Sequence, residues 1–329
     1  DFKTTDFTIC TFAEALEKYP EKVLAHFAQY ADYQTDAFTA LNTALAENGV
    51  FIHIPEGKII EKPIVLYQIS DATKPTIANL RHLIIAEKNS QFSLIEHFIG
   101  KNETVSFTNA VTEIVVEAHA RVNYFKIQQE DQKSYHIGTT QVCQQKDSYF
   151  SAVTVTLSGV FVRNNLHLVL DAENCEAHMF GLYLPNENQL VDNHTLADHR
   201  KPNSYSNELY KGILDGKSVG VFNGKIFVRR DAQKTNAFQS NRSLVLSEEA
   251  TMNTKPQLEI FADDVKCSHG AAVGQLDENM LFYLQTRGIP VREAKGLLML
   301  AFANEVLLEV KNEPLRIYLE KAVSEKMKG

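Results

Sequence analysis

The sequence predicts a mainly β protein with helical regions at both ends. Runs of β-branched and aromatic residues follow one another from about Val50 to about Val273, and no convincing amphipathic helix interrupts them. So long a stretch of strands without crossover helices excludes the alternating pattern of α/β proteins and leaves a sandwich, a barrel or a β-solenoid. Asparagine recurs between Asn164 and Asn253, which favours many tight bends, because asparagine tolerates left-handed backbone conformations. A solenoid uses such a bend at every turn. We place this strand-rich region at residues 50–275.

The first region, residues 1–49, is expected to contain short helices. Thr11 and Glu14 have the spacing of a capping box, in which two side chains satisfy free backbone amides at the start of a helix. Asp36 is expected to cap a further helix, and the pair Asn48-Gly49 is expected to end it.

The last region, residues 276–329, returns to helical periodicity. Met280, Tyr283 and Leu284 lie on one face of a first helix, a second helix follows, and a final helix is expected from about Pro314. The apolar stripes of these helices must be covered. Packing against the strand region or against one another is the favoured interpretation, and a dedicated partner site is the alternative.

Composition limits the class of function. Of the 329 residues, 33 are Lys or Arg and 41 are Asp or Glu, and the net charge of −8 argues against a broad nucleic-acid-binding surface. No run approaches the roughly 18 to 20 apolar residues of a membrane span, and no basic segment precedes an apolar one as in a signal peptide. We therefore expect a soluble, cytoplasmic protein that does not bind membranes. Four cysteines lie far apart without a CxxC pair, which fits reduced thiols: Cys10, Cys143, Cys175 and Cys267.

Two apparent motifs are rejected. The segment from Gly212 to Ser218 resembles a phosphate-binding loop, but three residues separate its glycines where four are needed, and a strand-like run follows. We expect a hairpin turn there. His194 and His199 are metal-ligand types, but their spacing does not place both rings on one helical face, so a loop with surface histidines is expected.

The densest group of reactive side chains lies around Cys267 and His269. In a strand these two residues point to the same face, about 7 Å apart, which is wide for chelating one tetrahedral ion but suits two ligands of a larger cluster. Thiolate and imidazole are ligands that iron–sulfur chemistry uses. On spacing alone, a buried cysteine beside a hydrogen-bonded histidine is the favoured interpretation.

An enzymatic alternative uses the carboxylates near the same strand. Asp263, Asp264 and Asp277, with His269 nearby, could serve as the paired acids of an inverting glycosidase on a β-solenoid. The absence of tryptophan for sugar stacking and the helical C-terminal region argue against this alternative.

Several ordered stretches resemble a known family, most densely from about Asn203 to about Val306. They are Lys211-Gly212-Ile213-Leu214, Val221-Phe222-Asn223-Gly224-Lys225-Ile226, Thr254-Lys255-Pro256-Gln257-Leu258-Glu259-Ile260, Ala262-Asp263-Asp264-Val265-Lys266-Cys267-Ser268-His269-Gly270 and Phe282-Tyr283-Leu284-Gln285-Thr286-Arg287-Gly288-Ile289. On these residues the chain resembles the SufB/SufD family of iron–sulfur cluster assembly proteins, and the sequence Cys-Ser-His is similar to its SufD branch.

The resemblance implies a right-handed parallel β-helix between helical ends, which selects the solenoid among the three β options. It also implies a scaffold that is not itself an enzyme, pairs with a SufB-like protein and binds the ABC-type ATPase SufC, which hydrolyses ATP. Members of the family usually carry a longer N-terminal helical region, so the region that begins at Asp1 is expected to be truncated.

The resemblance further implies a metal or cluster site at His269, with Cys267 as the less secure ligand. No cofactor is expected to bind tightly to the isolated chain, and iron or an iron–sulfur cluster would be held transiently in the complex. SufC docking is expected within the C-terminal helices, from Leu276 to Met327. The isolated chain could form a homodimer through the edge that a SufB-like partner would occupy. The remaining alternative is a chain that only holds its SufB-like and SufC-like partners in place and never binds metal.

Overall fold

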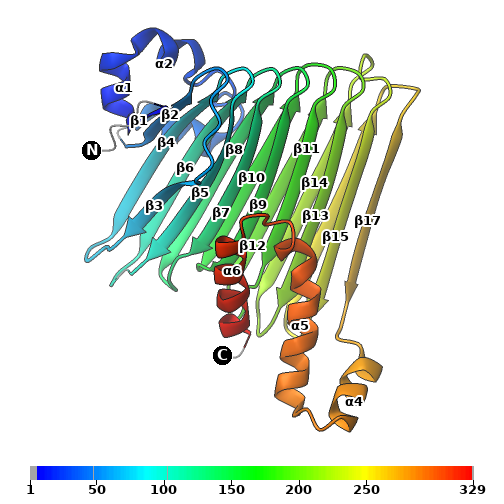
Figure 1. Ribbon diagram of the computed structural model, residues 1–329. Coiled ribbons are helices and arrows are strands. Elements are labelled where there is room, and N and C mark those ends of the chain that lie inside the picture. The colour runs from blue at the N-terminus through cyan, green and yellow to red at the C-terminus, as the bar shows by residue number, and fades with distance from the viewer. Residues whose placement is uncertain (1–5, 47, 102, 328–329) are drawn as a thin grey trace.

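The structure is a parallel β-solenoid with helices at both ends (Figure 1). It is a computed structural model that describes residues 6–46, 48–101 and 103–327. Eight turns each contribute one strand to each of two facing sheets. The first sheet contains β1 (Thr8–Thr11), β2 (Val50–Ile54), β4 (Thr76–Ala86), β6 (Ser106–Val116), β8 (Ser134–Gln144), β10 (Phe161–Leu170), β12 (Leu190–His199), β14 (Val219–Val228) and β16 (Thr251–Ile260). The second sheet contains β3 (Ile64–Ser70), β5 (Gln91–Gly100), β7 (Arg121–Gln129), β9 (Tyr149–Ser158), β11 (Glu176–Tyr183), β13 (Tyr205–Leu214), β15 (Asn236–Val245) and β17 (Lys266–Gly274).

Strand pairing confirms the predicted β-helix and excludes the sandwich and the barrel. From β2 onward, each strand pairs in parallel with the strands two positions away in the chain, because consecutive strands belong to opposite sheets. Parallel neighbours need a long crossover connection, and here the strand of the opposite sheet supplies it instead of a helix. Within the described part of the chain, the one antiparallel pair joins β1 to β2.

Three short helices lie beside the first turns: α1 (Phe12–Lys18), α2 (Pro20–His26) and α3 (Ala37–Ala44). The predicted capping box is confirmed, with the backbone amide of Glu14 donating to Thr11 Oγ1 at 3.3 Å and that of Thr11 donating to Glu14 Oε2 at 3.1 Å. Asp36 caps α3 as predicted, by accepting a hydrogen bond from the Thr39 amide. This helix ends at Ala44, before the predicted Asn48-Gly49.

A buried ion pair fastens the segment after α2 to the solenoid. Arg81 on β4 and Glu113 on β6 are both inaccessible to solvent and contact each other directly. The carboxylate of Glu113 also accepts hydrogen bonds from the backbone amides of Ala28, Tyr30 and Ala31, each at 2.9 Å. This one side chain therefore satisfies three amides of a segment that has no regular structure of its own.

The C-terminal helices are α4 (Glu278–Thr286), α5 (Val291–Leu307) and α6 (Glu313–Lys326). Helices α5 and α6 lie against the outer face of the second sheet, where Met299 and Leu319 join a cluster that includes Phe125 and Val153. Packing on the strand region therefore covers part of the stripes of these two helices, and leaves Leu297 and Tyr318 exposed. Helix α4 projects past the last strand and buries none of its residues. No helix in the described ranges is both long and apolar enough to cross a bilayer.

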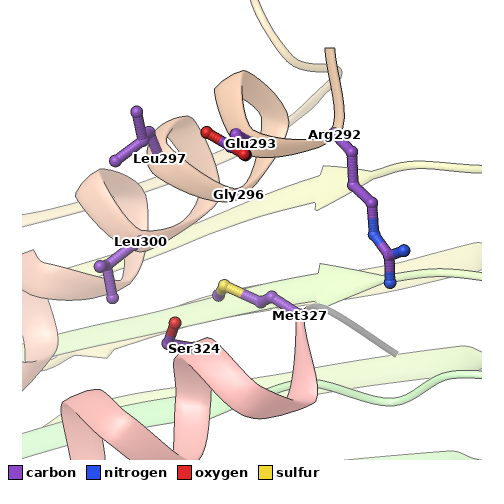
Figure 2. Close-up of a pocket in the computed structure, with 7 residues that line it drawn as sticks. All are labelled: Arg292, Glu293, Gly296, Leu297, Leu300, Ser324 and Met327. Carbon is purple, nitrogen blue, oxygen red and sulfur yellow. The ribbon is translucent and has the colours of Figure 1, made fainter. Parts of the chain in front are cut away.

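Lys211 of β13 ties α5 to the sheet. Its ammonium group donates to the carbonyl of Phe302 at 2.9 Å, lies 4.1 Å from the centre of the Phe302 ring and pairs with Glu305. Between α5 and α6 a cavity of about 540 Å³ opens, lined by residues that include Leu297, Leu300 and Met327 (Figure 2).

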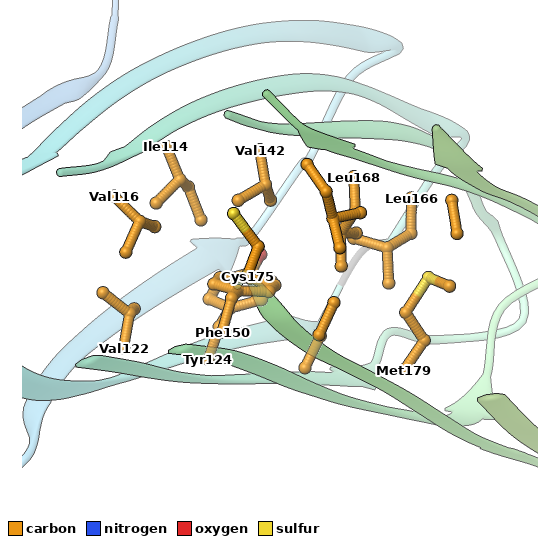
Figure 3. Packing of buried hydrophobic residues seen from close by; sticks show 14 of the residues in the cluster. Ile114, Val116, Val122, Tyr124, Val142, Phe150, Leu166, Leu168, Cys175 and Met179 are labelled. Carbon is orange, nitrogen blue, oxygen red and sulfur yellow. The ribbon is translucent and has the colours of Figure 1, made fainter. Parts of the chain in front are cut away.

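The core lies between the two sheets, where inward side chains stack in columns along the solenoid (Figure 3). Ile84, Ile114, Val142 and Leu168, for example, pair in register on β4, β6, β8 and β10. Each is at most 1% exposed, and burying such a side chain contributes about 1.5 to 3 kcal/mol. In-register stacking therefore fixes which residue of each turn faces inward.

Left-handed residues turn the chain at the same corner of six successive turns. Their backbone amides donate to a carbonyl of the following turn; the six residues are Asn89, His119, Asp147, Asn174, Asn203 and Lys234. The expected role of asparagine in bends is thus met at Asn174 and Asn203. Asn164 and Asn193 instead lie buried within strands.

Two local predictions are wrong. The segment after Gly212 is a corner rather than a hairpin, because it joins β13 to β14, which belong to different sheets. His194 and His199 lie on strand β12 rather than in a loop, and His199 is fully buried, with its Nε2 atom 2.9 Å from Ser206 Oγ. These errors arise because a solenoid corner and a strand with polar side chains, such as inward His199, look like loops in the sequence.

Candidate metal centre at the open end of the solenoid

The C-terminal end of the solenoid is open. Among the described strands, β17 pairs only with β15 and β16 only with β14, so one edge of each carries unpaired backbone groups. Pro256 lies in β16, as expected of an edge strand, where a missing amide hydrogen costs least. Inward residues of this last turn, including Met252, Leu258 and Val265, are only partly buried against the core. In the described ranges, the end therefore presents both strand edges and apolar surface, which is what a protein interface requires.

Cys267 and His269 both lie on β17, two residues apart as the sequence predicts. Register places Cys267 beside Ala237 and His269 beside Gln239 on β15, and both of these neighbours are buried. Paired residues of neighbouring strands share a face of the sheet, so Cys267 and His269 occupy inward positions at the open end.

The two side chains differ in environment. Cys267 is half-buried and packs against the core, and desolvation raises the pKa of its thiol, while the Ala237 backbone amide lowers it. The thiol is therefore protonated at neutral pH and must lose its proton to bind a metal. His269 is exposed, and its ring makes no hydrogen bond with any described residue. Spacing alone favoured a hydrogen-bonded histidine at this position. Among the described residues, the ring of His269 has no such hydrogen bond.

Two donors do not complete a site. In the described part of the chain, no group of three or more His, Cys, Asp or Glu is arranged to hold a metal ion. Cys267 and His269 would supply an iron ion or cluster with one thiolate and one imidazole ligand. Both ligand types are found at iron–sulfur sites. The remaining ligands would have to come from another molecule at the open end.

The carboxylates of the glycosidase alternative are not assembled into an acid pair. The carboxylate of Asp277 caps α4 by accepting from the amides of Asn279 at 2.8 Å and Met280 at 3.2 Å. Asp263 and Asp264 are exposed at the corner before β17. Nothing in this arrangement supports glycoside hydrolysis.

Two buried polar residues behind His269 were not predicted from the sequence. Glu208 on β13 and Gln239 on β15 precede His269 in the same inward column, and they are 2% and 3% exposed. Burial raises the pKa of Glu208 to about 7, although hydrogen bonds from Thr195 and Gln239 lower it. The alternation of Ser206, Glu208 and Tyr210 is the signal that could have revealed a polar interior, had the strand register been known.

Comparison with known proteins agrees with the geometry. The core-domain model of the SUF system for FeS cluster assembly (SufBD core domain) matches residues 68–302, and the SufBD protein N-terminal region matches residues 4–66. An iron–sulfur cluster assembly SufBD family protein of Synechocystis is 36% identical over 310 residues, which cover 90% of this chain and 68% of the relative.

Two further relatives extend this comparison. The iron–sulfur cluster assembly protein SufD of Escherichia coli is 32% identical over 299 residues, or 90% of this chain and 71% of that protein. The chloroplast protein ABCI7 of Arabidopsis thaliana is 36% identical over 291 residues, or 85% of this chain and 61% of that protein. Because the two family models together match most of its length, this chain belongs to the SufBD family of iron–sulfur cluster assembly proteins and is SufD-like.

Proposed function

We propose that this chain is a non-catalytic scaffold of a cytoplasmic SUF complex, which joins a SufB-like protein at its open end and a SufC-like ATPase at its C-terminal helices. The observation that carries the proposal is an open solenoid end that holds Cys267 and His269 without the further ligands a metal needs among residues 6–46, 48–101 and 103–327. A second chain that pairs with this end would bring both the missing ligands and cover for the exposed edges.

The chain's own residues have defined tasks in this scheme. A neutral ring of His269 offers a lone pair to iron or to a cluster, which is the cargo of the complex. The thiol of Cys267 binds only after it loses a proton, since desolvation raises its pKa. The apolar rim around them excludes water once the partner is in place. Hydrolysis of ATP is assigned to the SufC-like partner.

The ATPase site is proposed on α4 and the adjoining part of α5. Helix α4 exposes Met280, Phe282 and Tyr283, at 54%, 67% and 55%, and Leu297 of α5 is 49% exposed beside the cavity of Figure 2. These side chains are the part of the C-terminal apolar stripes that the solenoid leaves uncovered. Large apolar side chains of this kind, grouped at one end of a molecule, favour a protein partner.

The metal part of the proposal is tested by anaerobic titration of Fe(II) into the complex of this chain with its SufB-like and SufC-like partners. His269→Ala is expected to abolish stoichiometric iron binding at the open end. The substitution removes the imidazole, which makes no hydrogen bond with the described residues and is therefore available to the metal. His119→Ala, which changes an exposed histidine at a corner far from β17, is the matched control and is expected to bind as the parent does.

Other outcomes identify the alternatives. Unchanged iron binding and cluster formation in both His269→Ala and Cys267→Ser would overturn the metal role. The chain would then serve only to hold its partners in place. The mass of the isolated chain in solution reports a further use of the open end, since a homodimer that dissociates when the SufB-like protein is added would place both partners on the same surface.

A further inference from the structure

We propose that Gln239, held in place by Glu208, positions the ring of His269 by accepting a hydrogen bond from one ring nitrogen. This inference rests on the proposed role of His269 as a ligand. The three residues follow one another on β13, β15 and β17 in a single inward column, with Glu208 in register with Gln239 and Gln239 in register with His269. Gln239 and Glu208 would be positioning residues that never touch the metal.

The amide group of Gln239 is fixed on one side. Its Nε2 atom donates to Glu208 Oε2 at 2.8 Å, in a buried setting where a hydrogen bond to a carboxyl group is strong. Gly224 on the facing strand leaves room for this side chain, because a Cβ atom there would lie 2.4 Å from Nε2 and 2.9 Å from Cδ of Gln239. A larger residue at position 224 would therefore displace the amide from its place beside Glu208.

The other side of the amide is unsatisfied. Gln239 Oε1 is buried and has no hydrogen-bond partner among the described residues. A buried polar atom without a partner is unfavourable, so a donor that reaches Gln239 Oε1 from the neighbouring strand would stabilise it. Because Glu208 on β13 engages the nitrogen, the oxygen on the opposite edge of the amide is left for the next strand, β17.

The residue that β17 presents there is His269, whose ring forms no hydrogen bond with the described residues. A turn of the ring toward the core would let one N–H donate to Gln239 Oε1. The other ring nitrogen would then carry its lone pair and face the open end, which is the tautomer that a metal needs. In its ionised form Glu208 sets this polarity, because a carboxylate can only accept, here from the amide nitrogen, and so keeps the amide oxygen toward His269.

Gln239→Met tests the inference with little change in side-chain volume. In the complex, Fe(II) affinity is expected to fall about 10- to 100-fold, the range typical of a lost partner behind a metal-ligating histidine. In the iron-free complex, with only this chain labelled with ¹⁵N-histidine, the ring signals of His269 are expected to change from one tautomer in the parent to a mixture in the variant. Gln144→Leu, at a buried inward glutamine of β8 away from the open end, is the control for a lost buried amide.

Glu208→Gln gives a second, independent test, since it keeps the shape of the side chain but no longer dictates which way the amide of Gln239 faces. The same mixture of tautomers is expected. Unchanged tautomer signals in either folded variant would overturn the positioning role, whatever iron binding does. Loss of iron binding in His269→Ala together with unchanged binding in Gln239→Met would leave the proposed function standing and reject this inference. Unchanged binding in His269→Ala would instead reject the proposed function.

Discussion

At the scale of single residues, Glu208 is the carboxyl group whose burial has the clearest energetic consequence. Burial raises its pKa to about 7 from an ordinary value of 4.5, so the folded state holds the proton more firmly than the unfolded chain. The stability that this provides is fully present below about pH 4.5 and is lost as the pH rises through about 7. Above that range the fold carries a buried charge that hydrogen bonds from Thr195 and Gln239 offset in part.

Glu208→Gln is expected to remove this pH dependence. Relative to the variant, the free energy of unfolding of the parent should fall by about 2 to 3 kcal/mol between about pH 5 and about pH 8. Urea unfolding of both proteins at the two pH values measures the difference. Comparison with the variant cancels the opposite effect of His167 and His199, whose pKa values burial lowers to about 4. Equal slopes for the two proteins would contradict the account.

At the scale of elements, the N-terminal segment depends on Glu113. Glu113→Gln leaves Arg81 buried without its counter-ion and weakens three hydrogen bonds to the backbone of residues 28–31. Breaking a buried ion pair typically costs about 3 to 5 kcal/mol, and we expect a loss of this size in the free energy of unfolding. Amide exchange should quicken at Ala28, Tyr30 and Ala31.

The matched control is Glu176→Gln, at an exposed carboxylate of β11, which should alter neither the unfolding free energy nor this exchange by a measurable amount. Protected amides at residues 28–31 in the Glu113 variant would show that α1 and α2, rather than this anchor, hold the segment.

Helix α4 gives a prediction about partner binding. Phe282→Asp changes a side chain that is 67% exposed, so the fold should tolerate it, while recovery of the SufC-like ATPase in co-purification should drop at least tenfold. Ile77→Asp, at an equally exposed apolar residue of β4 near the other end, should retain the ATPase. Equal recovery from both variants would move the ATPase site away from α4.

Local signals in the sequence were enough for the helix starts and for the class of fold. Thr11 and Asp36 act within a few residues of their own position, so their caps are readable without tertiary structure. The polar column of Glu208 and Gln239, buried His199 and the corner after Gly212 depend on which strand lies beside which. That register becomes visible only when the turns are stacked. Cys267 and His269 could be placed on one strand, but their missing ligands could not, since the described chain does not supply them.

At the scale of the whole molecule, the two ends of the solenoid differ. At the N-terminal end, antiparallel β1 extends the first sheet, β3 is the edge strand of the second sheet, and Phe7 and Ile9 pack against the core. At the C-terminal end, β16 and β17 keep an unpaired edge, and Cys267 is packed only partly against the core (Figure 1). The two ends therefore differ in their side chains rather than in their strand edges. We propose that association occurs at the C-terminal end, because Cys267 and His269 lie there and helix α4 beside it exposes apolar side chains.

The most direct test of this account is to co-express the tagged chain with the SufB-like and SufC-like proteins of its source and to quantify protein, iron and sulfide in the eluate after anaerobic reconstitution. The account predicts stoichiometric recovery of both partners, with iron and sulfide that depend on His269. Recovery of neither partner, in a sample whose chain is folded, would contradict it.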